Sequence, residues 1–225
     1  MRKHFTLVIC VAISGMIFSS CRPATESVTL SCAELLATPL QPFIGQVLVS
    51  DDFVRAAANA YGISPQAVSL QTVEETDWKV SWTYKGYRYT AWTEHGGIIN
   101  RIVVELHNPR VVTAGHLIDC MGSEPEWYSA HYGMEAPRPG VTYHFVLYFP
   151  RQGIVVTSEN YVERNEQPPL LAADSPMDDV VIGSSGSLAD LYERRWGFSI
   201  ETGNPAWKPI PWPGRWSAVH WLEDR

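Results

Sequence analysis

The chain has 225 residues, 45% of them apolar, and a formal net charge of −7. This length and composition suit one globular unit of ordinary size or two small ones. The negative charge and the lack of a basic stripe disfavour a nucleic-acid partner, because clustered Lys and Arg hold such partners. Beyond the N-terminal segment, no apolar stretch approaches the roughly 20 residues of a membrane-spanning helix.

The N-terminus has the parts of a secretion signal. Met1 to His4 is basic, Phe5 to Phe18 is an apolar run, and small residues lead into Cys21. The run of roughly 14 residues is too short to span a bilayer about 30 Å thick but has the usual length of a signal-peptide core. We therefore expect residues 1–20 to be removed as a signal peptide.

The segment Phe18-Ser19-Ser20-Cys21 resembles a bacterial lipobox, in which the cysteine receives a diacylglycerol on its sulfur. The resemblance implies a lipoprotein of the cell envelope, anchored through lipid on Cys21 at the extracytoplasmic side of a bacterial membrane. Two or three acyl chains hold a protein stably at a bilayer. Phe18 stands where an aliphatic residue is usual, so an ordinary signal cleaved near Ser20 is the alternative.

The cysteine count predicts one disulfide. Cys10 leaves with the signal and Cys21 would carry lipid, so Cys32 and Cys120 remain for an exported domain in an oxidising compartment. Metal binding is the alternative, because His116 and Cys120 lie four residues apart on one helical face. Only these two ligands are in view, so we predict no metal site and no cofactor.

Residues 21–49 are predicted to form the lipid anchor, a polar tether and a lead-in of one short helical turn and a loop, because Pro39 and Pro42 break longer elements. Residues 50–108 are then predicted to form a helix and an antiparallel meander. Ser50 is a good N-cap and Gly62 a C-terminal stop. The segments expected to be extended are residues 68–73, 78–84, 87–91 and 98–106, with tight turns at 85–86 and 95–97.

Residues 109–203 are predicted to repeat this order. Helical spacing of apolar residues indicates a helix from Val111 to Met121 that ends at Gly122, and residues 125–132 are expected to form another helical turn. A last helix is expected at 188–196. The strands expected in this unit are residues 141–149, 153–161 and 179–182. Two tandem helix-plus-meander units imply an α+β fold with two small sheets, each with one helix-covered face.

Residues 204–225 form a C-terminal strap that is rich in proline and tryptophan and cannot be a regular helix. We expect its indoles to pack over a sheet edge; an exposed aromatic platform for sugars is the alternative. The candidate binding side chains are Trp127 and Tyr128, beside the turn at Gly122, and Trp212 in the strap. If these side chains are buried, their role is structural.

Leu117 to Tyr128, followed by Tyr143 to Phe149 and Gly153 to Val156, resembles small extracytoplasmic α/β modules. In these modules a helix ends in a Leu-Gly-x-Pro turn, an aromatic residue follows, and a tyrosine-rich strand pairs with a Gly-Ile or Gly-Val strand. BamE-like outer-membrane lipoproteins and β-lactamase-inhibitor-like domains are of this type. Here the turn is one residue longer between Gly122 and Pro125. The resemblance supports the fold more than the function, because function lies in a site.

No catalytic constellation is predicted. The segment 183–187 lacks the second glycine of a nucleophile elbow, so its serines are expected to include the N-cap of the next helix and Ser185 is not expected to be a nucleophile. Glu74, Glu75 and Asp77 could bind calcium or act as acids and bases, but at a turn between strands solvated charge is the expected role.

Three functional hypotheses follow from these patterns. The leading one is a non-enzymatic lipoprotein that presents a protein-interaction surface to an envelope partner. The second is a carbohydrate-binding surface protein that uses the C-terminal indoles. The third is a hydrolase built on the carboxylates or on His131. A deep pocket with perturbed carboxylates would favour an enzyme, and an exposed aromatic patch would favour a binding protein.

Overall fold

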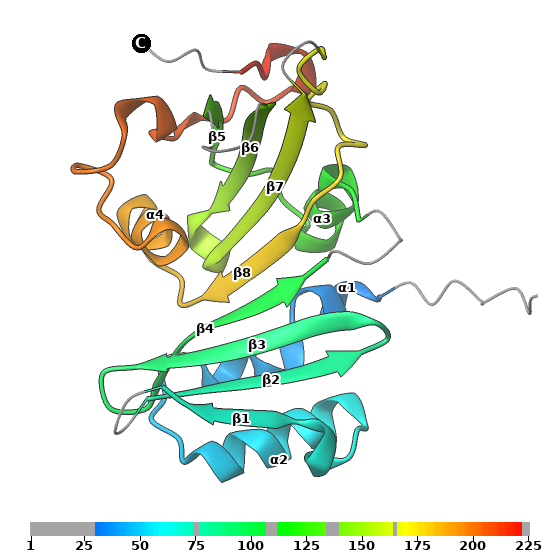
Figure 1. Cartoon of the computed structure of the whole chain (residues 1–225), viewed down its shortest axis with the longest axis vertical. Helices are drawn as coiled ribbons and strands as arrows, with labels where there is room; N and C mark the ends of the chain where they lie inside the picture. The colour runs from blue at the N-terminus through cyan, green and yellow to red at the C-terminus, as the bar shows by residue number, and fades with distance from the viewer. Residues whose placement is uncertain (1–29, 74–76, 107–111, 134–139, 164–165, 222–225) are drawn as a thin grey trace, which may run out of the picture.

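A computed structural model describes residues 30–73, 77–106, 112–133, 140–163 and 166–221 (Figure 1). The predicted signal peptide and Cys21 lie outside these residues, as does the expected boundary between the two units near residue 108. In the described part of the chain, nine strands form one antiparallel sheet. The strands are β1 (Ser69–Thr72), β2 (Trp78–Tyr84), β3 (Tyr87–Glu94), β4 (Ile98–Glu105), β5 (Trp127–Gly133), β6 (Gly140–Phe149), β7 (Ile154–Glu163), β8 (Asp179–Gly183) and β9 (Ile210–Pro211).

The strand order is β1-β2-β3-β4-β8-β7-β6-β5-β9, so each half of the sheet contains a four-stranded meander, and β9 adds a further strand beside β5. The α+β class with helix-plus-meander units is confirmed. The two meanders nevertheless share one sheet where two were expected, because β4 pairs with β8 and places Val103 opposite Val181. Each of these strands would otherwise expose an edge of unpaired backbone groups, which pairing satisfies.

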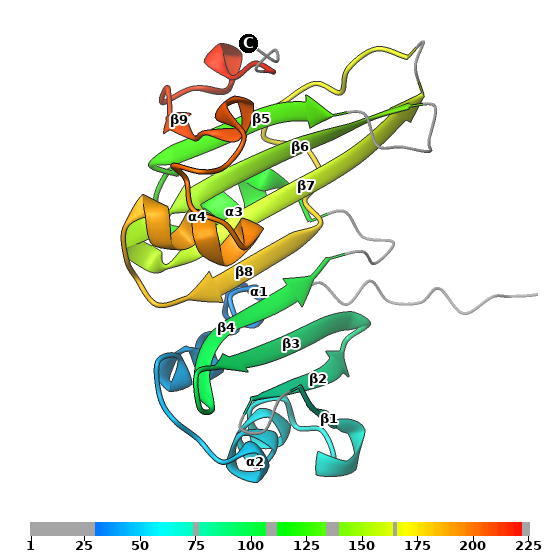
Figure 2. The same cartoon turned by 60° about the vertical axis from the view of Figure 1, so that its left-hand side comes forward.

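The helices lie on both faces of this sheet, three on one face and one on the other (Figure 2). They are α1 (Cys32–Leu35), α2 (Ser50–Tyr61), α3 (Ala114–Met121) and α4 (Leu188–Trp196), with 3-10 turns η1 (Thr38–Phe43), η2 (Pro65–Ala67), η3 (Pro150–Gln152), η4 (Pro205–Trp207) and η5 (Trp216–Ala218). Helices α1, α2 and α3 bury the main core on one face, whereas α4 packs on the opposite face of the second half. The sheet of the second half is therefore covered on both sides.

Helix α2 shows how the local sequence sets these elements. Gly62 ends it in the left-handed conformation at φ 61°, as expected, and Ser50 is its first helical residue after an N-cap at Val49. The buried ring of Phe53 lies 6.3 Å from that of Trp82 on β2. Alternation along β2 therefore turns Trp82 toward the helix and leaves the intervening polar side chains on the other face.

The segment that follows Pro125 differs from the expectation of a helical turn. Residues 127–133 form β5, which pairs along its whole length with β6. Tyr128 and Ala130 are buried in the main core, whereas Trp127 packs against the smaller cluster with α4 on the other face. The pairing with a long, buried strand overrides the local preference for a turn after proline, because β5 would otherwise lose its backbone hydrogen bonds.

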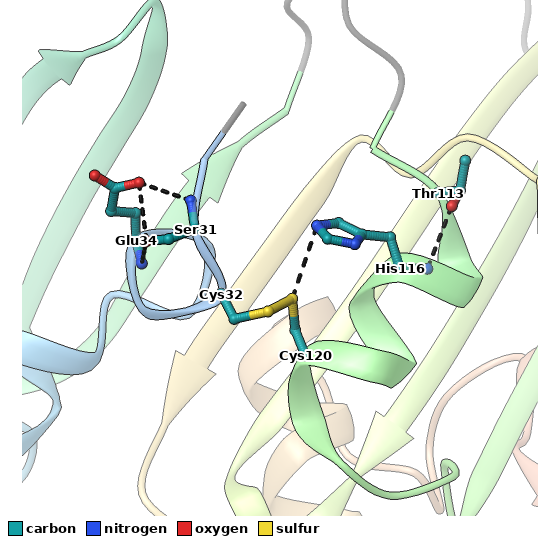
Figure 3. The surroundings of a disulfide bond; sticks show 6 residues. All are labelled: Ser31, Cys32, Glu34, Thr113, His116 and Cys120. Atoms are coloured by element: carbon teal, nitrogen blue, oxygen red, sulfur yellow. Dashed lines mark hydrogen bonds between the residues drawn. A yellow bond between two sulfur atoms is a disulfide. The ribbon is translucent and has the colours of Figure 1, made fainter. Parts of the chain in front are cut away.

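The predicted disulfide between Cys32 and Cys120 is confirmed, with 2.04 Å between the sulfurs (Figure 3). It joins α1 to α3 and so ties the lead-in of the chain to the second half. Nε2 of His116 lies 3.8 Å from Sγ of Cys120. Because Cys120 is bonded to Cys32, it offers no free thiolate to complete a metal site with His116.

The C-terminal strap packs around the edge of the sheet, as expected. Ile210 and Pro211 pair with β5 as β9, which covers that edge. Before β9, the indole of Trp207 stacks on one face of the sheet, 4.7 Å from the ring of His131. After β9, Trp212 and other strap residues pack against the opposite face.

Candidate functional site

One face of the first half of the sheet, here called the open face, is covered by no helix of the described chain (Figure 1). It lies opposite α1 and α2 and carries the outward residues of β1 to β4. In the strand registers these residues are Ser69, Gln71, Lys79, Ser81, Thr83, Arg88, Thr90, Trp92, Glu94, Ile98, Arg101, Val103 and Glu105. The face is mainly polar, with three basic side chains, two acidic ones and a few apolar ones.

Trp92 stands at the centre of the open face between two cations. Lys79 on β2 and Arg101 on β4 are its direct cross-strand partners. The Lys79 ammonium lies 4.3 Å from the centre of the Trp92 ring, and the Arg101 guanidinium carbon lies 5.5 Å from it. Each such cation–π contact stabilises an exposed arrangement by roughly 0.5–1 kcal/mol. The three side chains thus form an ordered row across three strands.

Two shallow hollows lie on this face, one on each side of Lys79. The first, of about 380 Å³, extends over β1 to β3, and the second, of about 220 Å³, reaches the flank of α4. Their linings include five basic residues and two acidic ones. The basic residues are Lys79, Arg88, Arg101, Arg194 and Arg195, and the acidic ones are Glu105 and Asp179.

The two acidic side chains of the hollows are paired within the protein. Glu105 lies 3.8 Å from the Arg88 side chain, and Asp179 lies 3.8 Å from Arg195. Burial raises the pKa of Asp179, and the charge of Arg195 opposes this shift. Arg101 donates a 2.7 Å hydrogen bond to the backbone carbonyl of Arg194, which fixes the edge of the second hollow against α4.

The corresponding face of the second half holds a covered polar cluster. His131, His144 and Glu159 stand opposite one another on β5, β6 and β7, and the two imidazoles stack with centres 5.1 Å apart. Arg195 of α4 lies 2.8 Å from Glu159. Burial beneath α4 and Trp207, aided by His144, lowers the pKa of His131 to about 3. The imidazole of His144, whose Nδ1 lies 3.6 Å from the Glu159 carboxylate, and the charge of Arg195 lower the pKa of Glu159 to about 2.

His131 is enclosed, whereas Glu159 at the rim of the cluster is exposed, and the cluster does not assemble a catalytic pair. Both ring nitrogens of His131 lack a hydrogen-bond partner within the described residues, and its side chain is completely buried. A general base needs a reactive hydroxyl, thiol or water within hydrogen-bond reach. We therefore assign the His131 cluster to the packing between the sheet and α4.

The candidate binding residues from the sequence lie away from the open face. Tyr128 is only 1% exposed and packs edge-on against Trp212 at 5.8 Å, so both belong to the contact between strap and core. Trp127 is half-buried and packs against the smaller core cluster beneath α4. The sheet separates it from Tyr128, because neighbouring residues of a strand face opposite sides.

The other residues considered for chemistry have structural roles. Ser187 is the N-cap of α4 and forms a capping box with Asp190, as expected for this serine-rich segment. A carboxylate oxygen of Asp77 accepts hydrogen bonds from the backbone N–H groups of Gly96 and Gly97, while Glu74 and Glu75 lie outside the described residues. Within the described residues, no three His, Cys, Asp or Glu side chains are placed to hold a metal ion.

The open face was not predicted as a binding surface, although the strand sequences contain a pattern that indicates it. Lys79, Ser81 and Thr83 alternate with the buried residues of β2 and mark a polar side. Trp92 falls on the same side of the next strand, where an aromatic residue is unusual among polar neighbours. Its register with Arg101 depends on the irregularity between Trp92 and Thr93, which the sequence did not reveal.

Comparison with protein families, curated proteins and solved structures finds no match to this chain. None of the helices in the described residues is long and apolar enough to cross a membrane. Function must therefore be inferred from the surface of the protein itself.

Proposed function

We propose that this protein is a non-enzymatic, lipid-anchored extracytoplasmic lipoprotein whose open face binds another protein of the cell envelope. The observation that carries the proposal is the row formed by Lys79, Trp92 and Arg101 on the face that no described helix covers. Tryptophan and arginine are the residues most enriched among the energetically dominant contacts of protein interfaces.

The shape and chemistry of the face favour binding over catalysis. Both hollows are shallow and spread over several strands, as a protein contact requires, and hydroxyl and amide side chains line the first of them beside Lys79. His131 and His144 lie instead on the face beneath α4, and Glu159, whose pKa is strongly lowered, lies at the exposed rim of that cluster. The open face thus offers anchor residues and hydrogen-bonding groups without a nucleophile beside a base.

The proposed anchor would hold the domain close to the membrane, attached on the α1 side of the sheet, opposite the open face. Residues 22–31 separate Cys21 from Cys32, and ten residues span at most about 36 Å when extended. The end of this tether is fixed to the fold by the disulfide and by Glu34 of α1, whose carboxylate lies 2.7 Å from the Lys85 ammonium. A partner of the open face would therefore be a protein of the same membrane surface or one that approaches it.

Proximity labelling from the anchored protein tests the binding proposal. The double variant Trp92→Ala/Arg101→Ala should lose the labelling of a specific envelope partner at unchanged expression and melting temperature. Arg151→Ala is the matched control, because Arg151 has a side chain that is 83% exposed and lies away from both hollows. Equal labelling in all three proteins would refute the proposal.

The anchor is tested separately by intact-mass analysis of the membrane fraction. The mature wild-type chain should begin at Cys21 and carry added acyl mass, whereas Cys21→Ser should leave a soluble or uncleaved form. A mature chain without lipid that begins at another residue would contradict the lipoprotein assignment.

Carbohydrate binding is the second candidate, supported by the hydroxyl and amide groups of Ser69, Gln71 and Ser81 in the first hollow near Trp92. The strap indoles do not support it, because Trp207, Trp212 and Trp216 pack on one another or on the sheet. A glycan array separates the candidates: retention of a defined sugar that depends on Trp92 would favour this second function.

A further inference from the structure

We infer that the open face binds an acidic protein segment that places carboxylates on Lys79 and Arg101 and an apolar side chain on Trp92. This inference rests on the proposed function and specifies the chemistry of its partner. Charge is distributed unevenly over the molecule. The whole chain carries a net charge of −7, yet the two hollows of the open face are lined by five basic residues and two acidic ones.

The cations at the centre of the face are the ones available to a partner. Glu105 is paired with Arg88, and Asp179 with Arg195. No salt bridge within the described residues joins Lys79 or Arg101 to a carboxylate; both cations lie against the ring of Trp92. Arg194 at the far side feels the charges of Asp190 and Glu94, so it contributes less than the central pair.

The geometry of the row sets what the partner must offer. Lys79, Trp92 and Arg101 stand opposite one another on three adjacent strands. Neighbouring strands lie about 4.8 Å apart, so the backbone positions of the two cations are separated by roughly 10 Å with the indole between them. A complementary segment therefore carries two carboxylates that flank an apolar or aromatic residue. Val103, beside Arg101 on the floor of the second hollow, extends the apolar contact.

Charge complementarity of this kind favours one class of partner. Opposite charges steer association and penalise partners of the same sign as the face. A carboxylate that reaches Lys79 or Arg101 gains a charge-assisted hydrogen bond and leaves the cation–π contact in place. A basic segment would instead meet the two cations at the centre.

Binding of three synthetic peptides to the purified, oxidised full chain tests this inference. The peptides are twelve-residue repeats of Xaa-Ser-Phe-Ser in which Xaa is Glu, Gln or Lys, so that an extended peptide presents Xaa and Phe on the same side. The indole N–H of Trp92 is followed by NMR. The Glu peptide should shift this signal and bind at least tenfold more tightly than the Gln peptide, and more weakly as salt rises. The Lys peptide should leave the signal unchanged. Equal binding of the Glu and Gln peptides would overturn the inference.

Variants locate the contact. Lys79→Ala and Arg101→Ala should each weaken binding of the Glu peptide about tenfold, and Arg151→Ala should change it less than twofold. A sulfated polysaccharide is tested alongside; if it binds at Trp92 and the Glu peptide does not, the acidic-protein inference fails. If the peptides fail while labelling of an envelope partner still depends on Trp92, the proposed function stands and only this inference falls. If the peptides fail to bind and the labelling does not depend on Trp92, both the proposed function and this inference are refuted.

Discussion

The two halves of the sheet have the same order of a helix and four antiparallel strands, yet they treat the second face of the sheet differently. In the first half that face is open and carries the row centred on Trp92. In the second half it is closed by α4 and by Trp207 of the strap, over buried sheet residues such as Val155 and Tyr148. The same order of strands is therefore compatible with a face that is buried by packing in one half and a face that is open in the other.

The strand sequences reflect this difference. In β2, buried apolar residues alternate with polar ones, as in a sheet with one solvated face. In β6, the segment from Phe145 to Phe149 is fully buried, and in β7 the segment from Ile154 to Ser158 is buried as well. Near-continuous buried runs are typical of strands that are covered on both faces.

Removal of the disulfide should cause the largest loss of unfolding free energy and tests whether the two halves of the sheet unfold together. The Cys32→Ser/Cys120→Ser variant should lose about 4–5 kcal/mol of unfolding free energy, because the bridge closes a loop of 88 residues that the unfolded chain would otherwise leave free. Guanidinium denaturation should show one transition at a lower midpoint, and the reduced wild type should match the variant. An unchanged midpoint would show that the bridge does not stabilise the joined halves.

A substitution in α4, the helix that covers the second half of the sheet, should cause the next largest loss of unfolding free energy. Leu191→Ala removes a completely buried side chain of α4 and should lower the unfolding free energy by about 3 kcal/mol through lost burial and a cavity. Trp92→Ala, its counterpart on the open face, should lower it by less than about 1 kcal/mol, because Trp92 is only half-buried and loses mainly cation–π contacts. Equal losses in denaturant titrations would mean that the two faces do not differ.

Acid should weaken the covered half selectively. The pKa of His131 is about 3 in the folded protein against 6.5 ordinarily, so the unfolded state binds a proton first as the pH falls. Above pH 6.5 both states hold His131 neutral, so this residue does not change the free energy of unfolding with pH. Below pH 6.5 the free energy of unfolding falls, by about 1.5 kcal/mol between pH 6.5 and 5. Glu159, with a pKa near 2 against 4.5, adds a further loss only below pH 4.5.

Denaturant midpoints between pH 5 and 7.5 measure this slope. His131→Phe should flatten it, since phenylalanine can occupy the stacked position without taking up a proton. His220→Gln, at an exposed position, should keep the slope of the wild type. A slope that survives in His131→Phe would assign the titration to other groups.

The open face should give the smallest effects. Thr83→Ala and Arg88→Ala alter exposed side chains of β2 and β3, so each should change the unfolding free energy by less than about 0.5 kcal/mol. Thermal and chemical denaturation of both variants checks this expectation. A loss above about 1 kcal/mol in either would show that these outward side chains contribute to stability.

Local sequence patterns predicted most strands and several ends of elements. Lys85 and Gly86 form the expected tight turn, with φ angles of 51° and 84° that a two-residue hairpin of this type requires. Leu188 to Trp196 forms the predicted last helix, capped by Ser187. These features depend on neighbours within a few residues, so the chain itself specifies them.

Features that depend on distant partners were missed. Residues 127–133 have the composition of a turn after Pro125, and only pairing with β6 makes them a strand. The union of the two meanders likewise depends on β4 meeting β8, which are more than 70 residues apart in the sequence.

By itself, the sequence determined most of the helices and strands, the pairing of Cys32 with Cys120 and the polar side of β2, because these follow from alternation, capping and the number of cysteines. The tertiary structure alone decided which faces are covered. It buried Tyr128 in the core and left Trp92 between two cations at the surface. The physical reason is that burial of a side chain on a sheet depends on where a helix docks, and α4 docks on only one half.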